Sequence, residues 1–140
     1  MAASSKYLDH LLQVPLFSSC SRKELAKIAR ATDEVHVEAG TTLMEQGRPG
    51  REAFVIVDGT ASVSVGGNEV ALLGPGQHVG ELALLDGGPR TATVVATSDM
   101  DLLVISQRAF VALLEDVPGL ARKVLTSMAA MVRSLNDQVV

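Results

Sequence analysis

Apolar residues near the N-terminus recur every three or four positions, which is the period of an amphipathic helix. The period runs from Tyr7 to Leu16 and again from Ser21 to Ala31. Ser21, with Glu24 three residues on, forms a capping-box pattern in which each side chain satisfies a free backbone amide at the helix start. The pattern predicts two short N-terminal helices over about residues 5–31.

From about residue 34 to residue 105 the helical period gives way to short β-branched runs that alternate with glycine-rich turns. Many short strands at regular spacing are typical of a β-barrel or a β-sandwich. The segment is therefore predicted to form an antiparallel β-roll, a jelly-roll-like barrel. The expected strands are Val35–Val37, Phe54–Val57, Ala61–Val65, Val70–Leu73, Thr93–Ala96 and Leu102–Ile105.

The helical period returns after Ser106, and two C-terminal helices are expected over about residues 106–136. Pro118 ends the first of them and can occupy the first turn of the second, which is expected to run to about Leu135. The apolar stripe of this last helix is wider than that of a simple surface helix, so the helix covers the roll or pairs with another chain. Its apolar positions are Leu120, Val124, Leu125, Met128, Met131, Val132 and Leu135.

These elements predict a mainly β fold with flanking helices, and a length of 140 residues suits one domain spanning residues 1–140. Hydrophobic residues make up 47% and charged residues 20%, which suits a packed interior and argues against an intrinsically disordered chain. The formal net charge of −4 speaks against binding to nucleic acid or an acidic membrane, because both depend on a basic surface. Any anion that the protein binds must therefore meet a local positive group.

Residues 1–6 lack the apolar core of a signal peptide, and no apolar stretch in the chain is long enough to span a bilayer. The single cysteine, Cys20, has no partner for an internal disulfide and fits a reducing compartment. We therefore expect a soluble, cytoplasmic protein with no membrane partner.

The stretch Gly80–Val94 interrupts the strand region with a short helix-forming piece, a flexible turn and a Pro-Arg pair. Glu81–Leu85 makes about one helical turn, and a helix start offers free amides and partial positive charge to a phosphate. Gly80 lets the backbone approach a ligand closely. Arg90 can donate two parallel hydrogen bonds to phosphate oxygens, while Glu81 can accept one from a sugar hydroxyl and hold the guanidinium in place. The segment therefore suits a phosphorylated sugar.

Gly80–Val94 closely resembles the phosphate-binding cassette of cyclic-nucleotide-binding domains, including the nine-residue step from Glu81 to Arg90 and the Ala-Thr-Val that follows. Other segments are similar to the family too, so the resemblance covers nearly all of the chain. These further segments are Pro15–Phe17, Glu45–Gly47, Phe54–Gly59 and Gly74–Gly76.

The resemblance implies that Glu81 binds the ribose 2′-hydroxyl and that Arg90 binds the cyclic phosphate of cyclic AMP or cyclic GMP. Val79 stands where the family often has an aromatic residue, and it is included among the residues expected to bind ligand. Backbone amides of the cassette would complete the anion site, and they belong to Gly80, Leu82, Ala83 and Thr91.

The choice between the two nucleotides depends on Thr91. In this family a threonine after the arginine can bond the guanine amino group, whereas related domains with a hydroxyl residue there also respond to cyclic AMP. A chain rich in alanine and valine is typical of a bacterial protein, in which cyclic AMP is the commoner signal. We therefore expect cyclic AMP in preference to cyclic GMP, bound as a ligand, with no cofactor.

Enzyme classes fit the sequence poorly. A cupin-type metalloenzyme shares the small-barrel pattern, but it needs clustered histidines with a carboxylate to hold a transition metal. His10, His36 and His78 are scattered and are interpreted as structural or exposed, so no metal site is expected. No nucleophile stands beside a base in a recognisable elbow. The expected role is regulatory binding without catalytic residues.

The last helix is expected to respond to ligand, with Met131 closing over the purine because a flexible thioether suits a movable lid. Leu125, Met128 and Val132 fall on one face and are expected to pack on the roll or on a partner helix, which includes a possible homodimer. The output would lie in an effector domain or protein outside the chain. The alternatives are a sensor fragment of a transcription regulator, channel, transporter or acetyltransferase, or a degenerate domain that only binds proteins.

Overall fold

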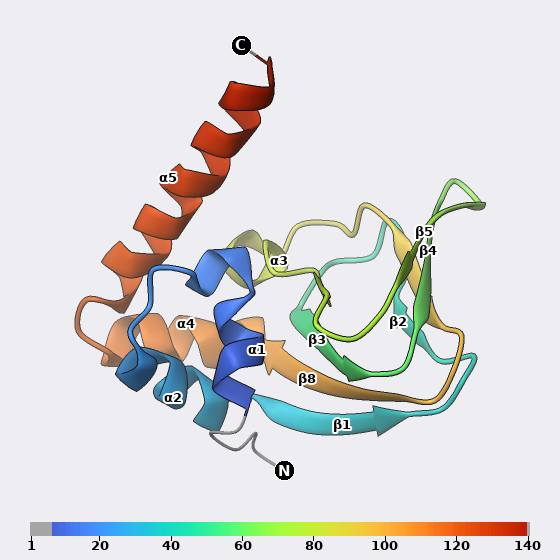
Figure 1. The fold of residues 1–140 in the computed structure, drawn as a ribbon, viewed down its shortest axis with the longest axis horizontal. Coiled ribbons are helices and arrows are strands. Elements are labelled where there is room, and N and C mark those ends of the chain that lie inside the picture. Colours follow the sequence, from blue (N-terminus) through green and yellow to red (C-terminus); the bar gives the residue numbers. More distant parts are fainter. Residues whose placement is uncertain (1–6, 140) are drawn as a thin grey trace.

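The computed structural model describes residues 7–139, with side chains up to residue 136 (Figure 1). The helices are α1 (Leu8–Leu12), η2 (Pro15–Phe17, a 3-10 helix), α2 (Arg22–Arg30), α3 (Ala83–Asp86), α4 (Gln107–Asp116) and α5 (Leu120–Val139). The strands are β1 (Asp33–Val37), β2 (Thr42–Met44), β3 (Glu52–Asp58), β4 (Ala61–Val65), β5 (Asn68–Leu73), β6 (His78–Val79), β7 (Thr93–Ala96) and β8 (Met100–Ser106).

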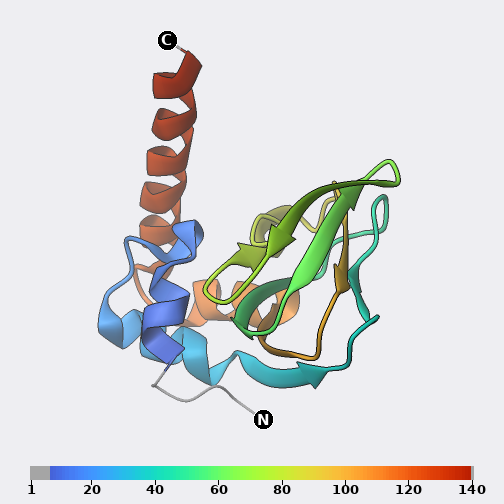
Figure 2. The same ribbon diagram turned by 45° about the vertical axis from the view of Figure 1, so that its right-hand side comes forward.

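The strands form two four-stranded antiparallel sheets, in the orders β1-β8-β3-β6 and β2-β7-β4-β5. The helices gather on one side of the first sheet, and α5 projects away from the strands (Figure 1, Figure 2). The prediction of a mainly β fold with flanking helices is confirmed. The barrel is not closed, however: no strand pairing joins the two sheets within residues 7–139. The strands β2 and β6, with three and two residues, are too short to carry a hydrogen-bonded ladder around a barrel.

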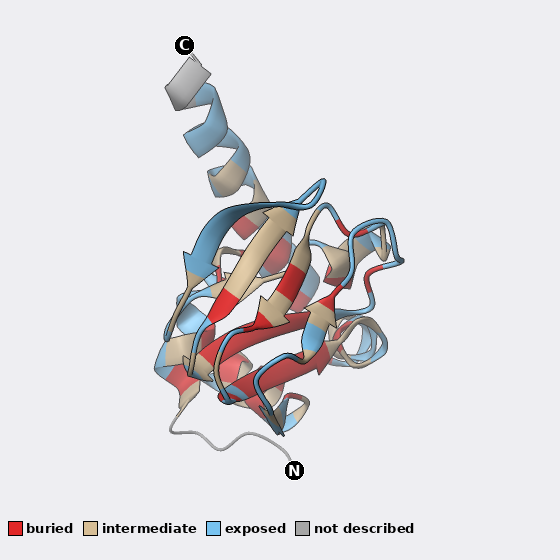
Figure 3. Cartoon of the chain, turned by 90° about the vertical axis from the view of Figure 1, so that its right-hand side faces the viewer, coloured by how far each residue is buried: buried red, intermediate tan, exposed pale blue. Residues whose placement is uncertain are grey.

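The central strands β3 and β8 are buried on both faces over residues 53–56 and 102–105, which explains the unbroken apolar runs there (Figure 3). Successive side chains of a strand point to opposite faces of the sheet. Ala53 and Val55 therefore face the core beneath the helices, while Phe54 and Ile56 face the core between the two sheets.

The core beneath the helices also anchors the short helix α3. Phe17 and Phe110 meet there with ring centroids 5.7 Å apart, and neither is more than 1% exposed. Leu84 of α3 is completely buried in the same cluster. Leu85, partly buried, packs against this cluster too, so the predicted phosphate-binding segment is fixed to the main core through α3.

The predicted capping box at the start of α2 is confirmed. The Ser21 hydroxyl accepts a hydrogen bond from the Glu24 amide at 3.1 Å, and the Glu24 carboxylate accepts one from the Ser21 amide at 2.8 Å. The bond from the Ser21 backbone is the largest influence on Glu24, and it lowers the pKa of that carboxyl.

Element boundaries differ from the predictions at several places. The strands β2 and β6 were not predicted, because two or three residues carry no readable alternation. The helix α3 begins at Ala83 and not at Glu81, and α5 starts two residues after Pro118 and continues beyond Leu135. The expected start of the first helix near residue 5 lies outside the described residues. No helix within residues 7–139 combines the length and apolar character that crossing a membrane requires.

The face of α5 that packs on the core matches the predicted one only at Met128, which packs against the core beneath the helices. Leu125 is 64% exposed and Val132 is 54% exposed, so neither packs on the roll. The buried positions are Leu120, Val124 and Ser127, which follow the helical steps of four and three. Because each residue turns the helix by about 100°, Leu125 points more than a quarter-turn away from the core side.

Candidate ligand-binding site

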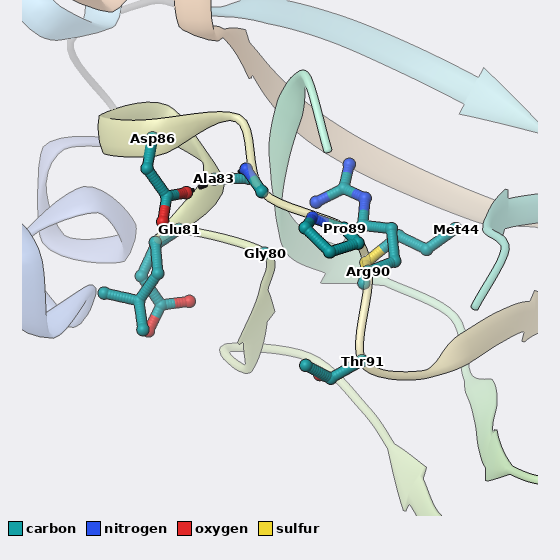
Figure 4. A pocket seen from close by; sticks show the side chains of 10 residues that line it. Met44, Gly80, Glu81, Ala83, Asp86, Pro89, Arg90 and Thr91 are labelled. Atoms are coloured by element: carbon teal, nitrogen blue, oxygen red, sulfur yellow. Dashed lines mark hydrogen bonds between the residues drawn. The ribbon is translucent and has the colours of Figure 1, made fainter. Parts of the chain in front are cut away.

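A cavity of about 360 Å³ opens beside α3 and the turn that follows it (Figure 4). Small-molecule pockets in proteins have volumes of roughly 300–1,000 Å³, so the cavity has room for one small ligand. Nearly all of its lining comes from the predicted cassette. The lining residues are Met44, Gly80, Glu81, Leu82, Ala83, Asp86, Gly88, Pro89, Arg90 and Thr91.

Arg90 is the one charged residue that is buried among residues 7–136, with 9% of its surface exposed. Its Nη2 atom donates a hydrogen bond of 2.8 Å to the backbone carbonyl of Glu52, at the start of β3. Its Nη1 atom is buried and has no hydrogen-bond partner among the described residues. Burial lowers the pKa of Arg90, against the negative charge of Glu52, which acts to raise it. A buried donor on a cation is costly unless an acceptor completes it, and an anionic ligand would supply one.

Two glycines make room for the Arg90 guanidinium. Gly80 has φ +80°, a left-handed conformation that favours glycine, and a Cβ atom there would lie 2.6 Å from Nη1. A Cβ atom on Gly50 would lie 2.7 Å from the Ala83 Cβ and 3.1 Å from Nη1. Gly80 was predicted to allow a close backbone approach, and the group that approaches it here is the arginine. Gly50 was not predicted, because its closeness to Arg90 arises only in the folded chain.

The backbone around Arg90 is braced by the turn that precedes β3. The Arg90 amide donates to the Arg48 carbonyl at 2.8 Å, and the Arg90 carbonyl accepts from the Gly47 amide at 2.9 Å. The Gly50 amide donates to the Gly88 carbonyl at 2.8 Å. These three bonds hold the end of the cassette in place before any ligand binds, which reduces the entropy lost on binding.

Glu81 does not hold the Arg90 guanidinium, contrary to the prediction. The two groups point away from each other on opposite sides of Gly80 (Figure 4). The Glu81 Oε2 atom instead lies 3.0 Å from Nδ1 of His78, and the two side chains are 15% and 25% exposed. The reason is that Arg90 is drawn toward the Glu52 carbonyl, while β6 places His78 beside Glu81.

The hydrogen bond with His78 favours the ionised form of Glu81. Burial acts to raise the pKa of the Glu81 carboxyl, but the hydrogen bond and the charge of His78 outweigh it. The resulting pKa lies below the ordinary value for glutamate, so the carboxylate is ionised at neutral pH. An ionised carboxylate is an acceptor only, so it can accept a hydrogen bond that a sugar hydroxyl donates. His78 was interpreted as structural or exposed, and its position three residues before Glu81 was the only sequence signal of this contact.

The turn after α3 is held by local hydrogen bonds. Gly87 ends the helix with φ 63°, the left-handed conformation common at helix ends. The Asp86 side chain accepts a hydrogen bond of 2.8 Å from the Gly88 amide. The Ala83 amide, predicted to face an anion, donates to the Gly80 carbonyl at 3.1 Å. In this structure it therefore has an internal partner.

The structure brings six of the eight predicted ligand-binding residues to the cavity: Gly80, Glu81, Leu82, Ala83, Arg90 and Thr91. Val79 lies outside the lining, half-buried against the core between the sheets. Met131 also lies outside it, because α5 runs beside η2. There it lines a separate groove, with Pro15, Ser18, Ser127, Ala130, Ser134 and Leu135.

Residues 34–117 match the family model described as the cyclic nucleotide-binding domain. Together, the β-roll and the cassette cavity define a cyclic-nucleotide-binding module, and the chain belongs to the cyclic nucleotide-binding domain family. The resemblance inferred from the cassette sequence is thereby confirmed. The family model describes a binding domain.

Similar proteins come from fungi and bacteria. A cAMP-dependent protein kinase regulatory subunit of Hypocrea atroviridis is 35% identical over 84% of this chain and 25% of its own length. A cyclic nucleotide-gated potassium channel of Mesorhizobium japonicum is 39% identical over 77% of this chain and 30% of its own length. The chain thus spans about a quarter to a third of these curated relatives.

Among solved structures, the N-terminal domain of a transcriptional regulator from Streptomyces coelicolor superposes with a TM-score of 0.82. It is 31% identical, and the match covers 91% of this chain and 95% of that one. The β-roll with flanking helices is therefore the fold of this family.

Proposed function

We propose that the cavity beside α3 binds a cyclic nucleotide, with Arg90 holding the cyclic phosphate and Glu81 accepting from the ribose 2′-hydroxyl. The observation that carries the proposal is the buried Arg90 Nη1 atom, which has no partner among the described residues and belongs to a residue lining the cavity. A phosphate oxygen would complete its hydrogen bonding, and a bond between charged groups is stronger than a neutral one. The ionised, half-buried Glu81 supports the assignment of the sugar hydroxyl.

We propose cyclic AMP as the ligand in preference to cyclic GMP. The relatives named cAMP-dependent protein kinase regulatory subunits support this choice. Titration calorimetry with cyclic AMP, cyclic GMP and 5′-AMP tests both the site and the choice, and we expect cyclic AMP to bind most tightly. A preference for cyclic GMP that Thr91→Ala removes would contradict the choice of nucleotide. Absence of binding by all three would leave a degenerate domain that only binds proteins.

We propose that the ligand acts through α5, which would shift toward the cassette and bring Met131 over the purine. A ligand shifts such an equilibrium only by its differential affinity for the two placements of the helix. The exposed C-terminal part of α5 supports this, because few contacts oppose its movement.

Met131→Ala should weaken cyclic-AMP binding by about threefold while leaving the stability of the free protein nearly unchanged. Met131 is half-buried against η2, so its loss from the free protein exposes little apolar surface. Parallel calorimetry and urea denaturation check the two effects. Unchanged affinity with a marked loss of stability would show that Met131 belongs to the packing of α5 and not to a lid.

We also propose that the chain is one cytoplasmic regulatory domain without catalytic residues, and that it acts on an effector domain or protein outside its sequence.

We propose that two copies associate through α5. The exposed Leu125, Val132 and Leu135 would form the contact between the copies, because steps of seven and three keep them on one face of the helix. Sedimentation velocity tests this proposal, and a monomer at all concentrations would contradict it.

A further inference from the structure

His78 contacts Glu81, but the binding roles described above assign the imidazole no part of its own in ligand binding. The His78 Nδ1 atom lies 3.0 Å from Oε2 of Glu81, and both side chains are largely shielded from water. Shielding strengthens a hydrogen bond between such groups, because the local dielectric is lower than that of water. The bond also occupies only one carboxylate oxygen, which leaves Oε1 for a ligand hydroxyl.

We propose that His78 is a positioning residue for Glu81 and that its protonation couples cyclic-nucleotide binding to pH, an inference that rests on the proposed function of the cavity. His78 sits on β6, whose pairing with β3 sets it opposite Val55. The strand fixes the imidazole, and the imidazole in turn fixes the rotamer of Glu81. The nucleotide therefore meets a carboxylate that is already oriented, which lowers the entropic cost of binding.

The other acidic groups on the elements around His78 do not pair with it, so Glu81 is its partner. On β3, Glu52 and Asp58 lie at the two ends of the strand, and the Asp58 carboxylate accepts from the Gly59 amide. On α3, the Asp86 carboxylate accepts from the Gly88 amide. Within the described residues, Glu81 is the only ion-pair partner of His78. The charge of the imidazole therefore acts chiefly on the carboxylate that faces the ribose.

The sign of the coupling follows from the charges. A cyclic nucleotide carries a negative phosphate, and Glu81 is a second negative charge in the same cavity. A protonated His78 offsets the Glu81 charge and thereby reduces its repulsion of the phosphate. Histidine changes its charge between about pH 5 and 8, and the Glu81 carboxylate, with its lowered pKa, stays ionised through that range. Affinity should therefore rise as the pH falls, and binding should take up protons.

Calorimetric titration with cyclic AMP between about pH 5.5 and pH 8.5 tests the coupling. We expect the wild-type protein to bind about three- to tenfold more tightly at the lower pH, with proton uptake revealed by buffers of different ionisation enthalpy. His78→Phe, which removes both the donor and the charge, should bind more weakly at every pH and show a flat profile. His78→Asn keeps a neutral donor, so it should match the wild type at high pH and lose the pH dependence.

His36 provides a matched control, because its Nδ1 atom lies 2.9 Å from a carboxylate oxygen of Asp101 and neither residue lines the cavity. His36→Phe should keep the wild-type pH profile. A wild-type affinity that does not change with pH, or that rises with it, would overturn the inference. So would a His78→Asn protein that keeps the full pH dependence. If the wild type binds no nucleotide at any pH, the proposed function fails and the inference falls with it.

Discussion

Arg90→Ala is expected to weaken cyclic-nucleotide binding by at least about tenfold, since hydrogen bonds to charged groups contribute roughly 1.5–3 kcal/mol each. The variant should still fold. The substitution removes a buried cation whose Nη1 atom is unsatisfied, and it frees only the Glu52 carbonyl, which lies near the cavity. Arg90→Lys should restore only part of the affinity, because a point charge cannot reproduce the planar fork of the guanidinium.

Arg48→Ala is the matched control for Arg90→Ala. Arg48 braces Arg90 through its backbone carbonyl, which the substitution keeps, and its own side chain is 74% exposed in an ion pair with Glu45. Calorimetric titration of both variants with cyclic AMP, together with circular dichroism to verify folding, separates the roles of the two arginines. If the folded Arg90→Ala protein bound cyclic AMP with wild-type affinity, the assignment of the cyclic phosphate to Arg90 would be wrong.

Leu120→Ala is expected to reduce the free energy of unfolding by about 2–5 kcal/mol, because Leu120 is completely buried and its truncation leaves a cavity. Leu125→Ala, on the same helix, should change it by less than about 0.5 kcal/mol, because that side chain is 64% exposed. The two variants have the same chemistry and differ only in burial. Urea denaturation at low protein concentration measures both, and equal losses would mean that α5 packs by another face.

The central strands were predictable because an unbroken run of apolar residues indicates a strand that is buried on both faces. The apolar run Phe54–Val57 belongs to β3, and its unbroken character follows from cores on both faces of the sheet. The face of α5 was not predictable in the same way. A wide apolar stripe allows several faces, and the choice among them depends on the packing of α5 against η2 and α4, which the stripe does not encode.

The cassette was predictable because its ligand-binding residues are close together in the sequence. Gly80, Glu81 and Arg90 all line the cavity as expected. Two contacts were missed for different reasons. Gly50 approaches Arg90 only because two loops pair, which the sequence pattern does not show. His78 lies only three residues before Glu81, but the spacing alone does not tell that the two side chains face each other. The expected bond between Glu81 and Arg90 failed because a backbone carbonyl competes for the guanidinium.

A crystal structure of the protein with cyclic AMP is the most direct test of the proposed site. We expect a cyclic phosphate oxygen within about 3 Å of the Arg90 Nη1 atom, and the ribose 2′-hydroxyl at a similar distance from the Glu81 carboxylate. Nucleotide bound elsewhere on the protein, or bound in the cavity with Nη1 still without an acceptor, would contradict it.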